Sequence, residues 1–312
     1  AGGTVVVVTF PGSLCASVVM LLSLLVALLL AAQCSAFVAP LTARKSLRIT
    51  PTLNAGNNVE VSDVGVVLLA GGKGSRMKSA IPKQFLKILG KPVFLRSLDV
   101  FTTMGSVVTS IVIVMDKSFR DEYAYLLEDA RISWADPGKE RQGSVYNGIS
   151  GIPDSCRIVA VHDSARPLVT QEEVLACLSD GLQHGAAVLG VPMKATVKES
   201  EDGQFVLRTV PRSTLWEIHT PQVATKQLFL RGFEKVQAEN LEVTDDVSVV
   251  EALGEPVKLT LGQYTNIKIT TPDDLPVAEQ ILRERGVKEY SEADEKSFAC
   301  SSERYRGSLS RK

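Results

Sequence analysis

Residues 65–85 read GVVLLAGGKGSRMKSAIPKQF, in which an apolar, β-branched run leads into three closely spaced glycines among basic residues. Gly71, Gly72 and Gly74 can adopt positive φ angles and let backbone N–H groups approach an anion, and the surrounding lysines and arginines add positive charge. The stretch therefore predicts a strand followed by a phosphate-binding loop. Taken alone, it is equally compatible with an ordinary glycine turn before a solvated basic helix.

Two common phosphate-binding motifs do not fit this stretch. A P-loop requires Gly-Lys-Ser or Gly-Lys-Thr, whereas Lys73 is followed by Gly74. The dinucleotide fingerprint requires a further glycine at the position of Met77. The sequence therefore disfavours both a P-loop nucleotidase and a Rossmann dehydrogenase.

Length and composition narrow the class of protein. The chain has 312 residues, of which 45% are hydrophobic, enough for a sizeable core in one large or two modest domains. Its formal net charge of -1 argues against a nucleic-acid binder, which usually carries a basic excess. The five cysteines form no C-x-x-C motif, and the three histidines show no zinc-ligand spacing. We therefore expect a small-molecule partner, no nucleic acid, no disulfide scaffold and no structural zinc.

The N-terminal sixty residues differ in composition from the rest. Residues 18–32 are almost continuously apolar, shorter than the roughly 20 residues of a membrane span, and are followed by Cys34, Ser35 and Ala36. This pattern predicts a signal peptide at 1–36, with a signal anchor as the alternative. Residues 37–60 carry Arg, Lys, Ser and Thr and no acidic residue before position 60, which is typical of a transit segment.

The two segments together resemble the bipartite plastid leaders of algae with secondary plastids, in which a phenylalanine, here Phe37, starts the transit peptide. The resemblance implies a protein of the plastid stroma, with no stable membrane association once the leader is removed. A secreted or membrane-tethered protein is the alternative.

From residue 61 to residue 286, β-branched runs alternate with helical patterns, which predicts an α/β domain with a mostly parallel sheet covered by helices on both faces. We expect strands at 64–69, 110–115, 158–162, 185–191 and 256–263. We expect helices at 93–103, 122–129, 144–149, 171–181 and 225–239.

Two features interrupt or follow this alternation. Short strands at 195–199 and 206–209 flank Ser-Glu-Asp-Gly and predict an inserted β-hairpin, within an arm at about 193–222. Because the edge of such a hairpin needs covering, we hypothesise that it mediates dimerisation. Residues 287–312 are charged and serine-rich, and we expect a disordered tail there.

Several further strings contain candidate site residues. Residues 135–145, ADPGKERQGSV, form a turn that opens a helix, where free N–H groups and Ser144 can read a base edge. Asp163 directly follows an apolar strand, at the carboxyl end where open α/β sheets bind ligands, and can hold Mg²⁺ or a sugar hydroxyl. Pairing of Asp163 with Arg166, as a cap of the next element, is the alternative. Residues 244–246, Thr-Asp-Asp, favour a helix N-cap.

Taken in order, these strings resemble the 2-C-methyl-D-erythritol 4-phosphate cytidylyltransferases of the non-mevalonate isoprenoid pathway, and most of all the plant plastid type. The resemblance covers about residues 63–284. It rests on LLAGGKGSRM, PKQF, PGKERQGSV, HDSARPLV, GAAVLGVPMKATVKE, LWEIHTPQ, LEVTDDVSVVE and YTNIKITTPDDL. It implies a Rossmann-like nucleotidyltransferase fold, a homodimer formed through the hairpin arm, and transfer of CMP from CTP to methylerythritol phosphate with Mg²⁺.

The resemblance also implies roles for individual residues. Arg76, Lys83, Arg212 and Lys268 correspond to the catalytic cations. The CTP-binding positions are Ala70, Gly71, Gly72, Gly74, Gly138, Ser144 and Asp163. The positions that bind the acceptor substrate are Asp163, Arg166, Thr196, Arg212, Thr220 and Lys268, with Arg212 reaching in from the neighbouring subunit. A magnesium ion is implied near the CTP phosphates, with Asp163 as a candidate ligand. Lys139 stands where other members carry Asp or another residue, so no role is carried over to it.

Two other functions fit much of the same sequence. A ribitol 5-phosphate cytidylyltransferase has a similar glycine loop and Lys-Gln-Phe string, and its acceptor differs by one carbon and a methyl group. A non-catalytic nucleotide-binding protein of the same fold is the second alternative. The presence of Arg76, Lys83, Asp163, Arg212 and Lys268 together argues for an enzyme.

Overall fold

The computed structural model describes residues 60–72, 77 and 81–291, all of which belong to the unit formed by Asn57–Lys312. The expected signal segment at 1–36, almost all of the transit segment at 37–60, and Gly74 and Arg76 lie outside the described residues. Within the described ranges, no helix combines the length and apolar character that a membrane span requires.

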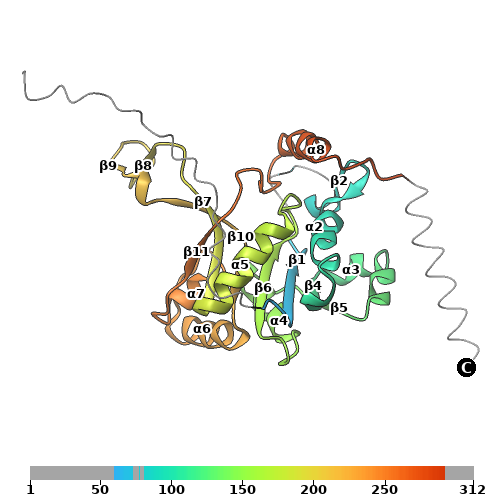
Figure 1. The fold of residues 1–312 in the computed structure, drawn as a ribbon. Coiled ribbons are helices and arrows are strands. Elements are labelled where there is room, and N and C mark those ends of the chain that lie inside the picture. Colours follow the sequence, from blue (N-terminus) through green and yellow to red (C-terminus); the bar gives the residue numbers. More distant parts are fainter. Residues whose placement is uncertain (1–59, 73–76, 78–80, 292–312) are drawn as a thin grey trace, which may run out of the picture. The chain divides into compact units, whose positions relative to one another are not determined.

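A seven-stranded sheet forms the centre of the domain, in the order β11-β7-β10-β6-β1-β4-β5. Neighbouring strands run parallel, except that β10 is antiparallel to both β6 and β7. The α/β class and the mostly parallel sheet are therefore confirmed (Figure 1). The strands are β1 (Val64–Leu69), β4 (Val108–Val114), β5 (Ile132–Ala135), β6 (Ile158–Asp163), β7 (Ala186–Pro192), β10 (Trp216–Ala224) and β11 (Lys258–Leu261).

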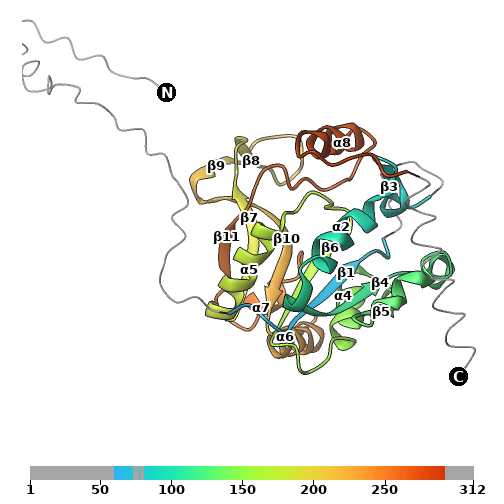
Figure 2. The same ribbon diagram turned by 45° about the vertical axis from the view of Figure 1, so that its right-hand side comes forward.

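Helices cover both faces of this sheet (Figures 1 and 2). One core contains the inward side chains of α2 and α5, and a second contains those of α4, α6 and α7. Strand β1 contributes Val66 to the first core and Val67 to the second, which explains why its sequence is apolar without alternation. The helices are α2 (Val93–Thr102), α3 (Lys117–Arg120), α4 (Arg141–Ser150), α5 (Gln171–His184), α6 (Lys226–Glu239), α7 (Ser248–Glu251) and α8 (Asp274–Glu284).

Local sequence fixes the ends of the longer helices. Thr170 and Glu173 form a reciprocal capping box at the start of α5. Thr225 accepts a hydrogen bond from Leu228 N–H at the start of α6, and Asn240 ends that helix in the left-handed conformation. The expected helix at 122–129 is instead a short 3₁₀ helix, η4 (Ala124–Glu128). Other 3₁₀ turns are η2 (Lys83–Phe85), η3 (Gly105–Val107) and η5 (Arg212–Thr214).

The arm is shorter than expected. Strands β8 (Val197–Glu199) and β9 (Arg208–Val210) form the expected antiparallel hairpin, which projects beyond the end of β7 in Figure 1. Residues 216–222, which we had included in the arm, belong to β10 of the central sheet. The arm therefore comprises about residues 193–215.

The C-terminal segment is ordered further than expected. Helix α8 packs on the small hairpin of β2 (Lys87–Ile88) and β3 (Lys91–Pro92), where Glu279 accepts a hydrogen bond from Leu89 N–H at 3.1 Å. Tyr290 N–H donates to Leu89 O at 2.9 Å, so residues 287–290 continue along this hairpin. The expectation of a tail from 287 is corrected for 287–291, and residues 292–312 lie outside the described part of the chain.

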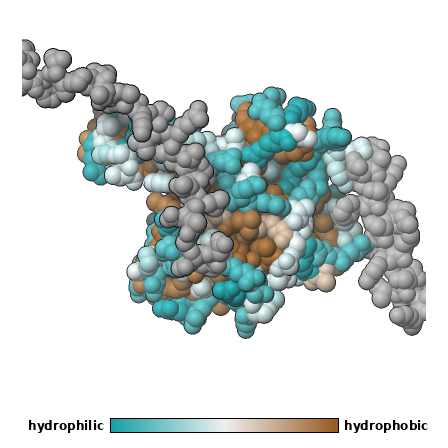
Figure 3. Space-filling view, viewed as in Figure 1, coloured by the Kyte–Doolittle hydropathy of each residue, from teal (hydrophilic) through white to brown (hydrophobic). Residues whose placement is uncertain are grey.

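Side chains are distributed as expected for a folded domain with a polar exterior. Hydrophilic residues predominate on the face seen in Figure 3, and apolar residues gather near its centre. Among the described residues, the most exposed large apolar side chain is Phe205, in the arm, which is 77% exposed and is followed in the chain by Val206 and Leu207 at 60% and 55%.

Candidate active site

A cleft of about 840 Å³ opens at the carboxyl ends of β1, β4, β5 and β6. It is lined by the glycine loop at 69–72, by Lys83 and Gln84, by residues 137–141 with Ser144, by residues 163–165, and by Lys268 and Thr270. This is the edge where open α/β sheets bind their ligands. The structure thus brings together most of the residues that the sequence marked as candidates.

The glycine loop is held from two sides. Gln84 donates its side-chain amide to Ala70 O at 2.7 Å and to Gly72 O at 2.9 Å. A Cβ atom on Gly71 would lie 2.9 Å from the side chain of Pro137, so only glycine permits this approach of the two loops. The described part of the loop is therefore fixed next to the 135–145 loop.

The 135–145 loop is folded tightly around Gly138. Gly138 N–H donates to Ser144 Oγ at 2.9 Å, and a Cβ on Gly138 would lie 2.5 Å from the carbonyl carbon of Gly143. Ser144 also donates to Glu140 O at 3.2 Å. The backbone of this loop consequently forms one wall of the cleft, with Lys139 on its rim.

Lys83 projects into the cleft from η2. Its ammonium group donates to Ile269 O at 2.6 Å, which links it to the segment between β11 and α8. That segment is itself ordered by Asp274, whose carboxylate accepts hydrogen bonds from Thr270 N–H and Thr271 N–H, both at 2.7 Å. The position of Lys83 is therefore determined by contacts nearly two hundred residues away in the chain.

Asp163 lies at the centre of a charged network that we call the Asp163 cluster, composed of Asp163, Arg141, Asp246 and Lys268. Lys268 donates to one carboxylate oxygen of Asp163 at 2.5 Å, and Arg141 donates to the other at 3.0 Å. Arg141 also forms a two-pronged contact with Asp246, whose side chain is 2% exposed. Two carboxylates and two cations thus neutralise one another at the base of the cleft.

The pKa values of the two carboxyl groups in this cluster are shifted in opposite directions, by charge at Asp163 and by burial at Asp246. Burial alone would raise the pKa of Asp163, but the neighbouring charges of Arg141 and Lys268 outweigh it and hold the pKa below its ordinary value. At Asp246 burial dominates and raises the pKa, and the charge of Arg141 only partly offsets it. Arg141 and Lys268 therefore hold Asp163 in its ionised form.

A buried polar layer lies behind Asp163. Thr220 accepts a hydrogen bond from Asp163 N–H at 3.1 Å and contacts His162 Nδ1 at 3.0 Å. Arg166 donates to Asn266 O at 2.7 Å and to Ile218 O at 3.3 Å. Thr220 and Arg166 are both buried, so within one chain they contact the protein around Asp163.

The arm residues Arg212 and Thr196 do not line the cleft of their own chain. Both are exposed, and Arg212 donates one hydrogen bond, to Lys194 O at 2.9 Å. Within a single chain, neither residue reaches the cleft where its expected contact with substrate would form.

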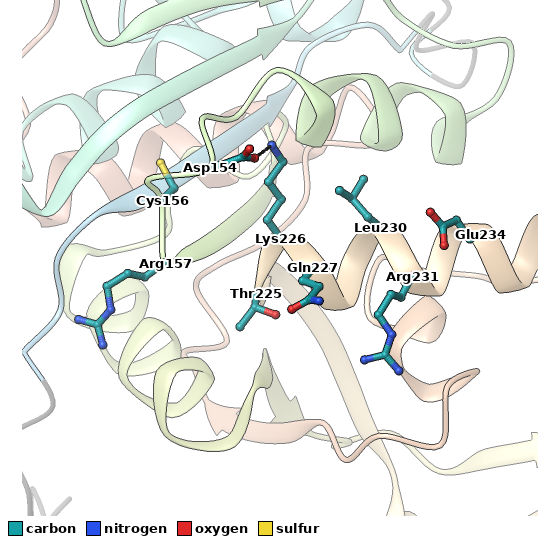
Figure 4. A pocket seen from close by; sticks show the side chains of 9 residues that line it. All are labelled: Asp154, Cys156, Arg157, Thr225, Lys226, Gln227, Leu230, Arg231 and Glu234. Carbon is teal, nitrogen blue, oxygen red and sulfur yellow. Dashed lines mark hydrogen bonds and ion pairs between the residues drawn. The ribbon is translucent and has the colours of Figure 1, made fainter.

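A second hollow of about 500 Å³ lies at the opposite, amino-terminal edge of the sheet, between the start of β6 and helix α6 (Figure 4). Lys226 faces Asp154 there, at 2.6 Å, and also donates to Ile152 O. Arg157 and Arg231 extend from different elements without pointing toward one another. This hollow therefore lacks the convergence of charges found in the cleft.

Metal ligands are scarce among residues 60–72, 77 and 81–291. These residues contain no group of three or more His, Cys, Asp or Glu side chains placed to hold a metal ion. Both oxygens of Asp163 already face cationic side chains.

Sequence reasoning missed three residues of the site. Gln84 lies in the Lys-Gln-Phe string and Arg141 in the 135–145 loop, but the sequence predicts no role for either. Asp246 is expected only as part of a helix cap. The expected N-cap is corrected: the N-cap position of α7 is Val247, and Asp245 accepts a hydrogen bond from Ser248 N–H at 3.0 Å just before that helix. The sequence offers one indication for Arg141: it is a charged residue directly before the buried face of a helix.

Comparison with known proteins gives a consistent result. The family profile described as 2-C-methyl-D-erythritol 4-phosphate cytidylyltransferase matches residues 64–284. The chain is 50% identical over 232 residues to "2-C-methyl-D-erythritol 4-phosphate cytidylyltransferase, chloroplastic" of Oryza sativa subsp. japonica, covering 74% of this chain and 78% of the rice protein. It is 41% identical to the enzyme of the same name from Caldanaerobacter subterraneus subsp. tengcongensis, covering 71% of this chain and 99% of the bacterial one.

A solved structure matches the fold as well. The crystal structure of 4-diphosphocytidyl-2C-methyl-D-erythritol synthase from Anaerococcus prevotii superimposes with a TM-score of 0.64 at 28% identity, covering 72% of this chain and all of that one. The mixed sheet and the cleft at its carboxyl edge therefore belong to a nucleotidyltransferase. Within that class, the chain belongs to the 2-C-methyl-D-erythritol 4-phosphate cytidylyltransferase family.

Proposed function

We propose that this chain transfers CMP from CTP to 2-C-methyl-D-erythritol 4-phosphate, giving 4-diphosphocytidyl-2-C-methyl-D-erythritol and pyrophosphate. Membership of the family supports the reaction. One structural observation carries the assignment to this site: the glycine loop, the 135–145 loop, Lys83 and the Asp163–Lys268 pair all open into a single cleft.

The nucleotide half of the cleft lies between the glycine loop and the 135–145 loop. Backbone N–H groups at Gly71 and Gly72, with Gly74 beyond them, suit the triphosphate, whereas Ala70 N–H already donates to Val114 O; the tight backbone around Gly138 and Ser144 suits a pyrimidine base. Arg76 and Lys83 would stabilise charge on the phosphates as the leaving pyrophosphate departs. Asp163 would accept a hydrogen bond from a substrate hydroxyl.

The acceptor half lies beside Lys268. Lys268 is 35% exposed and adjoins the cleft, so it can exchange its contact with Asp163 for one with the acceptor phosphate. Arg212 and Thr196 would reach this half from the arm of a second subunit. Thr220 and Arg166 support the same region from behind Asp163.

The chemistry needs no protein nucleophile. A phosphate oxygen of the acceptor attacks the α-phosphorus of CTP in line with the departing pyrophosphate, and negative charge accumulates on the bridging and equatorial oxygens. Fixed cations and N–H groups therefore provide the main stabilisation. Lys83 is suited to this because its bond to Ile269 O orients it before substrate arrives.

We propose that a divalent metal enters this site together with the phosphates of CTP, because the described part of the chain holds no group of three or more candidate ligands. Mg²⁺ commonly keeps several waters and binds through one or two carboxylates together with substrate phosphates. Asp163 lies at the base of the cleft, paired with Arg141 and Lys268, and Asp116 and Glu140 also line the cleft. When bound, Mg²⁺ would neutralise charge on the triphosphate.

The assembly and location are proposed on separate grounds. The exposed apolar residues Phe205, Val206 and Leu207 suit burial of the arm against a second copy of the chain. The rice relative is named as chloroplastic, which supports a plastid location. The proposed bipartite leader that would direct it to the stroma lies outside the described residues.

Pyrophosphate release tests the proposal. We expect release from CTP with 2-C-methyl-D-erythritol 4-phosphate as acceptor, and far less with ribitol 5-phosphate at equal concentration. Greater release with ribitol 5-phosphate would identify that compound as the acceptor of the enzyme. If neither acceptor gave release, the chain would be a nucleotide-binding protein and the proposal would be wrong.

A further inference from the structure

His162 is a buried residue beside Asp163 to which neither the family resemblance nor the proposed reaction gives a role. Its side chain is fully buried, and Phe101 packs against it edge-on with ring centroids 5.2 Å apart. Nε2 lies 3.1 Å from Arg166 O, and Nδ1 lies 3.0 Å from Thr220 Oγ1. Both ring nitrogens are therefore engaged.

The chemistry of these partners determines the direction of each hydrogen bond. A carbonyl oxygen can only accept, so Nε2 carries the proton and donates it to Arg166 O. In the neutral ring Nδ1 must then accept, and the hydroxyl of Thr220 donates to it. The ring is fully buried against Phe101, and both of its nitrogens face neutral oxygen atoms, an environment that favours the uncharged imidazole. The ring is therefore neutral at neutral pH.

The oxygen of Thr220 is left to accept from the backbone of Asp163. Strand β10 pairs with β6 only from Gln222↔Val161 to Ala224↔Val159, so Asp163 N–H has no backbone partner on that side. Thr220 Oγ1 takes the place of that partner at 3.1 Å. The oxygen of the Thr220 hydroxyl can accept from Asp163 N–H because the hydroxyl proton is directed to Nδ1 of His162.

We propose that His162 is a positioning residue of the active site, acting through the hydroxyl of Thr220 to hold the main chain of Asp163. Its second bond, to Arg166 O, closes the 162–166 turn around the same residue. The carboxylate of Asp163 is thereby presented to Arg141 and Lys268 at one fixed position. This inference rests on the proposed role of Asp163 in the reaction.

Matched substitutions at Thr220 test the inference. Thr220→Val keeps the shape of the side chain and removes the hydroxyl, whereas Thr220→Ser keeps the hydroxyl. We expect Thr220→Val to lower kcat/KM by about 10- to 100-fold, because a small displacement of a positioned group is costly, and Thr220→Ser, which restores the hydroxyl, to recover most of that loss.

Comparison with Asp163→Asn separates positioning from a general structural role. Thr220→Val and His162→Gln should change the same kinetic parameter, kcat or KM, as Asp163→Asn does. Adding either substitution to Asp163→Asn should cost less than about 3-fold more, because the variants act through one group. Independent, multiplicative losses would overturn the proposal, and so would a Thr220→Val enzyme with wild-type kinetics.

A spectroscopic measurement remains informative if a variant folds poorly. The chain has three histidines, so ¹⁵N resonances of the wild-type imidazole rings can be assigned by substitution of the other two. We expect His162 to be protonated only at Nε2. Protonation at Nδ1 would overturn the proposal. A wild-type enzyme without cytidylyl transfer would refute the proposed function instead, and the two failures are therefore distinguishable.

Discussion

The Asp163 cluster and the arm are built in contrasting ways. Asp163 is 8% exposed, and its contacts come from α4, from β10 and from the segment after β11. The side chain of Arg212 in the arm is exposed and forms one hydrogen bond, to Lys194 O in the same arm. A single chain can therefore position the base of the cleft before substrate binds, whereas the side chain of Arg212 has little to hold it in place within its own chain.

Substitutions of cleft residues should have the largest effect, and this effect should appear in kcat and KM. Lys83→Ala removes a fixed cation near the transferred phosphate and should lower kcat by about 10²- to 10³-fold, or about 2.7–4 kcal/mol, with little change in KM for methylerythritol phosphate. Lys268→Ala should mainly raise that KM. Steady-state kinetics in both substrates will measure this, with the exposed Lys87→Ala as control. Equal effects of both substitutions on both parameters would contradict the assigned roles.

The pH dependence of stability should expose the buried layer behind Asp163. The folded pKa of His162 is about 4 and its ordinary value is 6.5, so the unfolded chain takes up the proton first. The contribution of His162 is complete above about pH 6.5 and is lost on acidification toward pH 4, by about 3 kcal/mol. Urea unfolding at several pH values should show a flatter dependence for His162→Gln. Parallel curves for the two proteins would contradict this.

Breaking the Asp163 cluster should lower the free energy of unfolding by slightly less than the loss expected from His162 at low pH. Arg141→Met leaves the carboxylate of Asp246 buried without its cation, although Arg141 is itself 38% exposed and partly screened by solvent. We expect the free energy of unfolding to fall by about 2–3 kcal/mol, below the value for a fully buried pair. Urea denaturation measures this, and a loss below about 0.5 kcal/mol would show that the cluster contributes little.

Substitution in the arm should leave stability almost unchanged. Arg212→Ala removes an exposed side chain with one backbone contact, so the free energy of unfolding should stay within about 0.5 kcal/mol of the wild type. The same urea titration tests this. A larger loss would indicate that the arm is held within its own chain.

The sequence predicted the parts of this contrast that depend on local pattern. The strand at 64–69 was predicted with its observed bounds, because an apolar run ending in glycines is unambiguous. Strand β10 was missed, because its sequence, WEIHTPQVA, contains polar residues and a proline. The hairpin of the arm could be predicted from its turn residues. The position where the arm ends could not, because it depends on where β10 begins.

Long-range contacts account for the rest of what was missed. Arg141 and Asp246 are 105 positions apart, and no local pattern connects them. Asp245 and Asp246 are adjacent and look alike in sequence, yet Asp245 accepts a hydrogen bond from Ser248 N–H and Asp246 is buried against Arg141. The role of Gln84 likewise depends on the folded position of the glycine loop.

The central claim is that one chain forms the base of the cleft and a second chain completes it with the arm. Mixing two inactive variants, Asp163→Asn and Arg212→Ala, after dissociation and reassociation tests this directly. Hybrid dimers would carry one site with both residues intact, so we expect activity to recover to about a quarter of the wild-type value. No recovery, with hybrid dimers shown to have formed, would contradict the account.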